Sequence, residues 1–245
     1  IGFQGVLQHT VKDAGSGFEG EEIEPILFSS DRNFRPTDLQ FGPDGALYIV
    51  DWFNPLVGHM QHNLRDPNRD HTHGRIWRIT YPGRPLLKNQ DLTKLSIPDL
   101  LEQLKSPEDR VRHRTRIRLR EFPAEDVVAA MQTWIGSLDR KAEDYEHNLL
   151  EALWVCQHHN TAANINAATR EFSQALLEGR LNSPDGRARA AAVRVLSHWR
   201  DLFPHVNVIT WLSSAANDEH PRVRLEAVRA ASWVNTAAAA EVALE

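Results

Sequence analysis

The sequence predicts a chain of mixed class, in which a β part is followed by an array of helical hairpins. Up to about Pro85, short apolar stretches alternate with glycine and proline turns, a pattern typical of strands. From about Leu95 the apolar residues recur with the period of a helix. We therefore expect one domain at residues 1–85 and a second at residues 95–245, joined by a linker at 86–94.

The composition excludes several classes of protein. With 245 residues, of which 41% are hydrophobic, the chain can bury ordinary cores. A net charge of -5 gives no reason to expect nucleic acid or an anionic membrane surface as a partner. The single cysteine, Cys156, excludes a disulfide framework, a CxxC zinc site and a covalently attached haem within this chain. Because it lies in an apolar run, we expect a buried thiol, with His158 and His159 as weak candidates for a partner base.

The start of the chain lacks the features of a signal peptide. It opens on Ile1 and enters strand-like sequence directly, without a basic segment followed by an apolar one. No apolar stretch reaches the length that spans a membrane. We therefore expect a fragment or a processed piece of a longer protein.

The first two strands are expected on either side of a glycine-rich turn. Residues 5–11 and 22–28 alternate as strands do, and the turn between them lies at residues 15–17. Pro25 lies inside the second stretch, and proline in a sheet is confined to edge strands, strand starts and bulges. The sequence therefore predicts an edge strand or a strand start there.

A clearer hairpin follows, and a further strand ends the β part. Residues 38–41 and 46–52 flank a Gly-Pro-Asp-Gly turn, in which proline presets φ and the last glycine supplies a positive φ. After a long interruption, residues 75–81 form another strand, which Pro82 and Gly83 end. The predicted order is strand, strand, long loop, strand.

The helical part contains an internal repeat. Helix breaks at Ser106, Ser183 and Asn217 are each followed by an Arg-x-Arg triplet, at 110–112, 187–189 and 222–224. The triplets are 77 and 35 residues apart, so one unit is missing between the first two, and residues 151–154 fill the gap. We therefore expect about four helical hairpins of roughly 35 to 40 residues.

This repeat resembles HEAT repeats, whose second helix commonly starts with an aspartate, a Val-Arg pair and a buried alanine. The first unit matches at Asp109 and Val111-Arg112, and the last at Asp218, Val223-Arg224 and Ala227. The second unit lacks the Val-Arg pair, and the third has Ala188-Arg189 in its place. The resemblance implies an α-solenoid.

Residues 110–120 alternate with period two, which by itself favours a strand. Wound as a helix, Val111, Thr115 and Leu119 share one face, and the repeat alignment favours this interpretation. The six arginines of this stretch then spread over several faces beside acidic residues, so a solvated surface is favoured over a phosphate-binding one. Tryptophans fall about once per helix and are assigned to the core. They are Trp134, Trp154, Trp199, Trp211 and Trp233.

The richest segment for chemistry is the interruption at residues 54–74. It holds four of the twelve histidines, and unstructured loops of this length usually carry function or are disordered. Imidazoles and carboxylates from it could converge on a divalent metal, although no spacing matches a named zinc signature. The candidate ligands are His59, His62, Asp66, Asp70, His71 and His73. The alternative is that these side chains form hydrogen bonds with the loop's own backbone, and that Arg65 pairs with Asp66 and Arg69 with Asp70.

Residues 41–52 and 58–76 carry a second resemblance. They are similar to the end of the propeller in the large membrane-bound dehydrogenase-like proteins of planctomycetes. Those proteins resemble glucose/sorbosone dehydrogenases and continue into HEAT-like repeats. The resemblance implies that the β part is a partial β-propeller, its last blade or so, in front of an α-solenoid of about four HEAT-like hairpins.

The same resemblance implies a function for the full-length protein. It would oxidise a sugar or alcohol with pyrroloquinoline quinone and a divalent cation, and pass electrons to a c-type haem domain. It also implies a periplasmic or exported location, with the remaining propeller blades and the haem domain as partners. This chain alone is not expected to be active, and no catalytic residue or quinone ligand is assigned to it.

In such a propeller, residues 29–36 open on the same face as the histidine loop. The rim would then be polar and partly cationic, suited to a hydroxylated or anionic ligand. It would consist of Asp31, Arg32, Arg35, Arg65 and Arg69. The alternative is that Arg32 and Arg35 pair with Asp31 and Asp38.

The alternative for the whole chain is a non-catalytic module whose HEAT-type array binds a protein or a polysaccharide, with nucleic acid as a lesser alternative.

Overall fold

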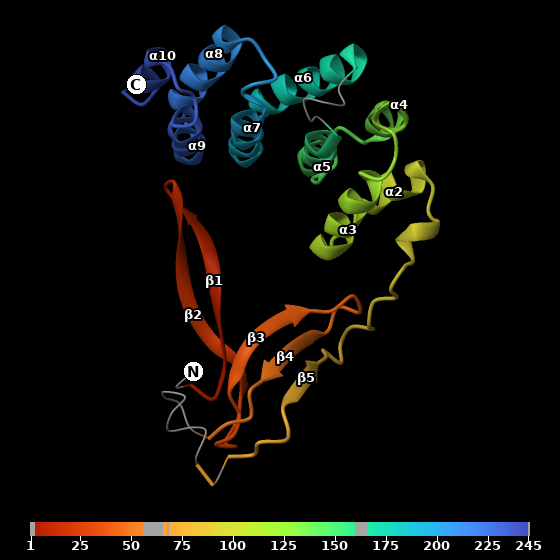
Figure 1. Ribbon diagram of the computed structural model, residues 1–245, viewed down its shortest axis with the longest axis vertical. Helices are drawn as coiled ribbons and strands as arrows, with labels where there is room; N and C mark the ends of the chain where they lie inside the picture. The colour runs from red at the N-terminus through yellow and green to blue at the C-terminus, as the bar shows by residue number, and fades with distance from the viewer. Residues whose placement is uncertain (1–2, 56–65, 68, 160–165, 245) are drawn as a thin grey trace. The chain divides into compact units, whose positions relative to one another are not determined.

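The computed structural model describes residues 3–55, 66–67, 69–159 and 166–244. The chain divides into two compact units, one formed by residues 1–12 and 18–90 and the other by residues 13–17 and 91–245. Strands make up the first unit and helices dominate the second (Figure 1). Among the described helices, none is long and apolar enough to cross a membrane.

The β unit contains two small sheets. The first is a long hairpin of β1 (Gly5–Ala14) and β2 (Gly17–Phe28). The second is an antiparallel sheet in the order β3 (Pro36–Phe41), β4 (Leu47–Asp51) and β5 (Arg75–Ile79). The strands therefore follow the order that the sequence predicts.

The two turns of this unit use the glycines that the sequence places in them. Gly15 has a φ of 56° between β1 and β2, and Gly45 has a φ of 75° between β3 and β4. Residues with a side chain adopt these angles only with strain, so glycine is favoured at both positions.

The core of the β unit is small. Leu39, Ile49 and Trp77 are register partners on one face of the three-stranded sheet. Of these, only Ile49 is fully buried, together with Val6 of the hairpin and Leu47. Leu39 and Trp77 keep more than two fifths of their surface exposed, because the base of the hairpin covers only the centre of the sheet.

The expectation of a partial β-propeller is wrong for the described residues. A propeller blade is a four-stranded sheet, whereas these strands form separate sheets of two and three strands with no closed barrel or propeller. Among the described residues, β1 and β2 pair with each other across the tight turn at Gly15, and neither of them pairs with β3. Local alternation predicts that a segment is a strand but does not determine its partner.

The helical unit begins with a short 3-10 helix at Leu92–Lys94. The helices that follow are α2 (Ile97–Gln103), α3 (Asp109–Leu119), α4 (Ala124–Ser137), α5 (Tyr145–His159), α6 (Ala167–Leu181), α7 (Gly186–Trp199), α8 (His205–Ala216), α9 (Pro221–Ala231) and α10 (Ala237–Val242). The arginine-rich stretch is thus helical, as the repeat alignment predicts.

These helices form antiparallel pairs stacked in two layers. Each even-numbered helix from α2 to α8 packs against the odd-numbered helix that follows it, and α3, α5, α7 and α9 pack successively against one another (Figure 1). We call α3, α5, α7 and α9 the B helices and α2, α4, α6 and α8 the A helices. One continuous apolar core runs between the layers.

Four of the five tryptophans that the sequence assigns to the helical core lie in it or against it. Trp134 and Trp199 are buried, and Trp154 and Trp211 are partly buried against the core. Trp233 is the exception, because 63% of its surface is exposed beyond the end of α9.

Candidate functional site

The predicted histidine loop is described only in part. His59, His62 and Arg65 lie outside the described residues. Asp66 accepts a hydrogen bond from the backbone of Arg69 at 3.2 Å, so both belong to one local turn. His71 and His73 are exposed.

Asp70 organises the end of this loop. Its carboxylate accepts from the backbone and hydroxyl of Thr72, at 2.8 and 2.7 Å, and lies 2.7 Å from His73 Nδ1. The hydrogen bond from the Thr72 backbone, followed by those from its hydroxyl and from His73, holds the pKa of Asp70 far below its usual range. This local turn uses the carboxylate that we predicted as a metal ligand, and the described residues contain no group of three His, Cys, Asp or Glu side chains arranged for a metal.

The predicted rim residues lie in different environments. Arg32 is exposed, whereas Arg35 is buried and donates to the backbone oxygens of Phe34 and Pro55 at 2.9 and 3.2 Å. Asp31 accepts from Arg75 at 3.0 Å. Arg35 is thus fastened to the start of the long loop through Pro55.

Sequence reasoning missed the centre of this polar cluster, which is Asp51. Its buried carboxylate accepts from the backbone of Arg35 and Phe53 at 2.8 and 2.9 Å, and from Arg75 and Trp77 at 2.8 and 2.9 Å. Phe53 has a φ of 54°, and the Arg75 guanidinium lies 3.9 Å from the centre of its ring. An aspartate at the end of a buried strand, opposite Arg75 in the register, is the signal that could have identified it.

Burial of the Asp51 carboxyl would raise its pKa, but hydrogen bonds from Arg35, Trp77, Phe53 and Arg75 outweigh it, and the pKa is lowered overall. The carboxylate therefore stays ionised at neutral pH and fully engaged. This arrangement holds the rim residues and the start of the long loop on the sheet edge. It leaves no oxygen of Asp51 free for general base catalysis.

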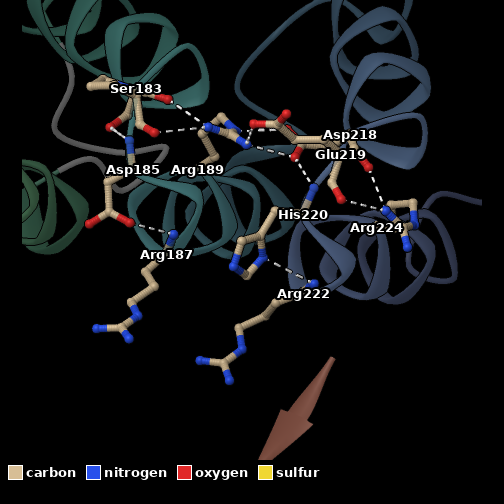
Figure 2. Close-up of polar contacts among 10 residues, drawn as sticks. Ser183, Asp185, Arg187, Arg189, Asp218, Glu219, His220, Arg222 and Arg224 are labelled. Carbon is tan, nitrogen blue, oxygen red and sulfur yellow. Dashed lines mark hydrogen bonds and ion pairs between the residues drawn. The ribbon is translucent and has the colours of Figure 1, made fainter. Parts of the chain in front are cut away.

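In the helical unit, the start of each matching B helix is built in the same way. Ser106, Ser183 and Asp218 each accept a hydrogen bond from the backbone amide two residues later, at 3.2, 3.1 and 2.7 Å. Six residues after each of them, an arginine turns back to donate to the same residue's backbone oxygen. These arginines are Arg112, Arg189 and Arg224, at 2.7, 2.9 and 2.7 Å. Figure 2 shows the last two copies.

Two of these arginines, Arg112 and Arg189, also link neighbouring B helices. Arg189 of α7 forms a two-pronged contact with the Asp218 carboxylate before α9, at 2.7 and 2.8 Å (Figure 2). Arg112 of α3 donates to Glu151 of α5 at 3.1 Å. Glu146 of α5 accepts from Ser183 just before α7. The repeats are therefore joined by charged hydrogen bonds as well as by apolar packing, and such bonds are roughly twice as strong as neutral ones.

Glu151 is the deepest charge of this network, with 1% of its side chain exposed. Arg112, Arg116 and His147 surround it. Burial would raise the pKa of Glu151, but hydrogen bonds from His147 and Arg116 and the charge of Arg116 outweigh it, so the pKa is lowered. Glu151 is therefore ionised at neutral pH, and it fixes α3 to α5.

A polar hollow of about 600 Å³ lies where α3 ends, α4 begins and α5 ends. Arg120, Glu125, His158 and His159 contribute to its lining. Burial, and then nearby positive charges, lower the pKa of His158, while burial is also the largest cause of the lowered pKa of His159. Cys156 is no nucleophile for these bases, because burial raises the pKa of its thiol to about 12.

A comparison with protein families finds two matches, each over about a third of the chain. Residues 4–83 match a family described as a domain of unknown function (DUF7133), and residues 173–245 match HEAT repeats. No curated protein and no solved structure matches the chain. The HEAT match confirms the prediction of helical repeats over these residues and supports a helical scaffold. No comparison supports the resemblance to a planctomycete dehydrogenase.

Proposed function

We propose that the chain is a scaffold that binds another protein through the outward face of its B helices. The observation that carries this proposal is that three large exposed apolar side chains lie on the B helices, whereas among the described A helices only Val206 is of this kind. Ile117 of α3 is 46% exposed, and Leu225 and Val228 of α9 are 48% and 42% exposed. Trp233, just after α9, is more exposed still. Apolar and aromatic side chains gathered among charged ones are typical of protein-binding surfaces.

The construction of the B layer supports this proposal. The ion pairs of Arg112 and Arg116 with Glu151, and of Arg189 with Asp218, tie successive B helices to one another. A face held in this way is organised before a partner arrives, so binding costs less conformational entropy. Stacked helical repeats present extended surfaces of this kind.

The quinone-dependent dehydrogenase function implied by the resemblance stays a prediction for a longer protein. So do its cofactors, its haem partner and its periplasmic location. The scaffold proposal is independent of them, because it rests on the helical unit alone.

Site-specific photo-crosslinking tests the proposed face. A photoreactive amino acid replaces Val228 on α9 in one variant and Val206 on α8 in a matched one. The two positions hold the same residue type, on a B helix and an A helix, and both are exposed. We expect Val228 to crosslink one discrete protein in extracts of the source cells, which mass spectrometry then identifies and a purified sample reproduces. Val206 should not crosslink it.

Crosslinks from Val206 alone would contradict the proposed face. So would a purified partner that binds a Val228→Arg, Trp233→Ala variant as tightly as the unaltered chain. Circular dichroism controls for folding, since both side chains are exposed and their loss should leave the helices intact.

A further inference from the structure

The B helix α9 repeats α7, so the two helices can be compared residue by residue. Their Arg-x-Arg triplets, at 187–189 and 222–224, are 35 residues apart. The matched pairs are Arg189 with Arg224, Ala190 with Leu225, and Val193 with Val228. Where two matched residues differ in burial, the difference shows what packs against α7 but not against α9.

One side of α7 faces the next B helix. Val193 lies four residues after Arg189 and three after Ala190, and residues at these spacings are neighbours on a helix surface. Arg189 contacts the Asp218 carboxylate just before α9, so this side of α7 faces α9 (Figure 2). Ala190 and Val193 are accordingly 3% and 0% exposed. We call this side of a B helix its leading side.

The leading side of α9 carries matching residues that are not covered. Leu225 and Val228 are 48% and 42% exposed, although the residues matched to them in α7 are buried. Among the described residues, no further B helix follows α9. These two side chains therefore form an apolar patch of the kind that holds α7 to α9.

Arg224 also lacks the contact that its counterpart makes. Arg189 pairs with the Asp218 carboxylate, and 12% of its side chain is exposed. Arg224 is exposed and donates to the backbone oxygens of Asp218 and Glu219, at 2.7 and 2.9 Å. Within the described part of the chain, no carboxylate pairs with Arg224. Its guanidinium thus stands beside the apolar patch, where Arg189 holds a carboxylate.

The opposite end of the helical array is closed. The 3-10 helix at Leu92–Lys94 packs against α3, and Leu92 is buried in the core. Arg118 of α3 donates to the backbone oxygen of Thr93 at 3.3 Å. The uncovered leading side of α9 is therefore not a property that both ends of the array share.

We propose that the leading side of α9 binds a helical hairpin of a partner protein, as α7 binds the hairpin of α8 and α9. An aspartate or glutamate just before the partner's second helix would pair with Arg224, and apolar residues of that helix would cover Leu225 and Val228. This inference rests on the proposed function and names the kind of partner that α9 receives. A carboxylate suits the position because arginine binds it through two parallel hydrogen bonds.

A second copy of the chain fits this side less well. In a copy, α5, α7 and α9 are each covered by the B helix before them, and α3 is covered by the 3-10 helix. If two copies instead joined through the leading sides of α9, Arg224 would meet Leu225 and Val228 of the other copy, but no carboxylate. A separate protein can supply the missing acid.

Hydrogen exchange of an extended chain tests the geometry. A synthetic hairpin of residues 202–234 is joined to the C-terminus of the ¹⁵N-labelled full chain through a flexible linker of about 12 residues, so that mass separates its peptides from those of the chain. This hairpin contains Asp218 and α9, the elements that α7 binds. We expect its amides to exchange at least about 10-fold more slowly than when it is joined to a Val228→Arg chain.

Matched variants isolate the patch and the charge. Val206→Arg in the chain, on the exposed side of α8, should leave the exchange of the hairpin unchanged. In the hairpin, Asp218→Asn keeps an oxygen for capping but loses the charge, and should speed exchange about 10-fold. Glu219→Gln should change it by less than about 3-fold, because the Glu219 side chain is 89% exposed beside Arg189.

Exchange that is insensitive to Val228→Arg in the chain and to Asp218→Asn in the hairpin would overturn the inference. So would a dimer of the unaltered chain in size-exclusion chromatography that Val228→Arg dissociates, because a second copy would then cover this side. If Ile117 and Arg194 crosslinked a protein while the hairpin stayed unprotected, the scaffold proposal would stand and this inference would fall. If the hairpin docked but no position crosslinked a protein, the reverse would hold.

Discussion

Glu151 should be the most costly single charge to remove from the helical unit. The variant Glu151→Ala leaves the guanidinium groups of Arg112 and Arg116, which are 14% and 15% exposed, without the carboxylate that both contact. Breaking a buried ion pair by removing one partner costs about 3–5 kcal/mol, because the remaining charge stays buried and unpaired. His147 also contacts Glu151 but is 44% exposed, so water can compensate for much of its loss.

We therefore expect Glu151→Ala to lower the free energy of unfolding by about 3 kcal/mol, near the lower end of that range, since the arginines retain some contact with water. Urea denaturation followed by circular dichroism at 222 nm measures the change. Glu121→Ala is the matched control, because the Arg118–Glu121 pair is exposed on the glutamate side. Its loss should cost less than about 1 kcal/mol.

The pH dependence gives a second measurement with a defined sign. Because folding lowers the pKa of Glu151, the stability that its ionised form contributes is present above the ordinary pKa of 4.5. That stability is lost as the pH falls through the lower, folded-state pKa. The difference in unfolding free energy between the unaltered chain and Glu151→Gln should therefore shrink below about pH 4.5. A cost below about 1 kcal/mol for Glu151→Ala, or a difference that grows on acidification, would refute the role assigned to this network.

Three further predictions follow from packing and burial. Gly186→Ala places a Cβ 2.4 Å from the His220 ring and should destabilise the chain by about 1–2 kcal/mol. Gly179→Ala, on α6, places a Cβ in open space and should stabilise the chain by about 0.5–1 kcal/mol. Equal effects of the two variants in thermal unfolding would contradict this. Cys156 should resist thiol reagents at pH 8 until the chain unfolds, because only about one thiol in 10⁴ is ionised at a pKa of about 12. Rapid labelling of the folded chain would argue against the burial of this thiol. Asp51→Ala should cost about 3 kcal/mol and speed hydrogen exchange of the β4 amides, and unchanged exchange would show that the cluster does not hold the sheet.

The sequence predicts the local elements of this chain well. The Gly-Pro-Asp-Gly turn specifies a hairpin because Gly45 must adopt a positive φ, and the structure has it there. The repeat alignment assigns residues 110–120 to a helix against their local alternation, because each unit must bury the same face. Such features depend on neighbours along the chain, which the sequence shows directly.

The sheet arrangement and the centre of the polar cluster are harder to predict from the sequence. Which strand pairs with which depends on turn geometry and on long-range contacts, so the propeller expectation failed even though the strands themselves were found. Asp51 looks like one more residue at the end of a strand until Arg35, Arg75 and Trp77 converge on it. Trp233 was assigned to the core because helical spacing alone does not show where the last helix ends.

The face that binds a partner is the central claim, and a crosslinking scan over the exposed positions of the A and B helices tests it most directly. We expect adducts to one protein from Ile117, Arg194, Leu225 and Val228 on the B helices, and none from Arg170, Val206 or Thr210 on the A helices. Adducts spread equally over both layers, or confined to the A helices, would contradict it.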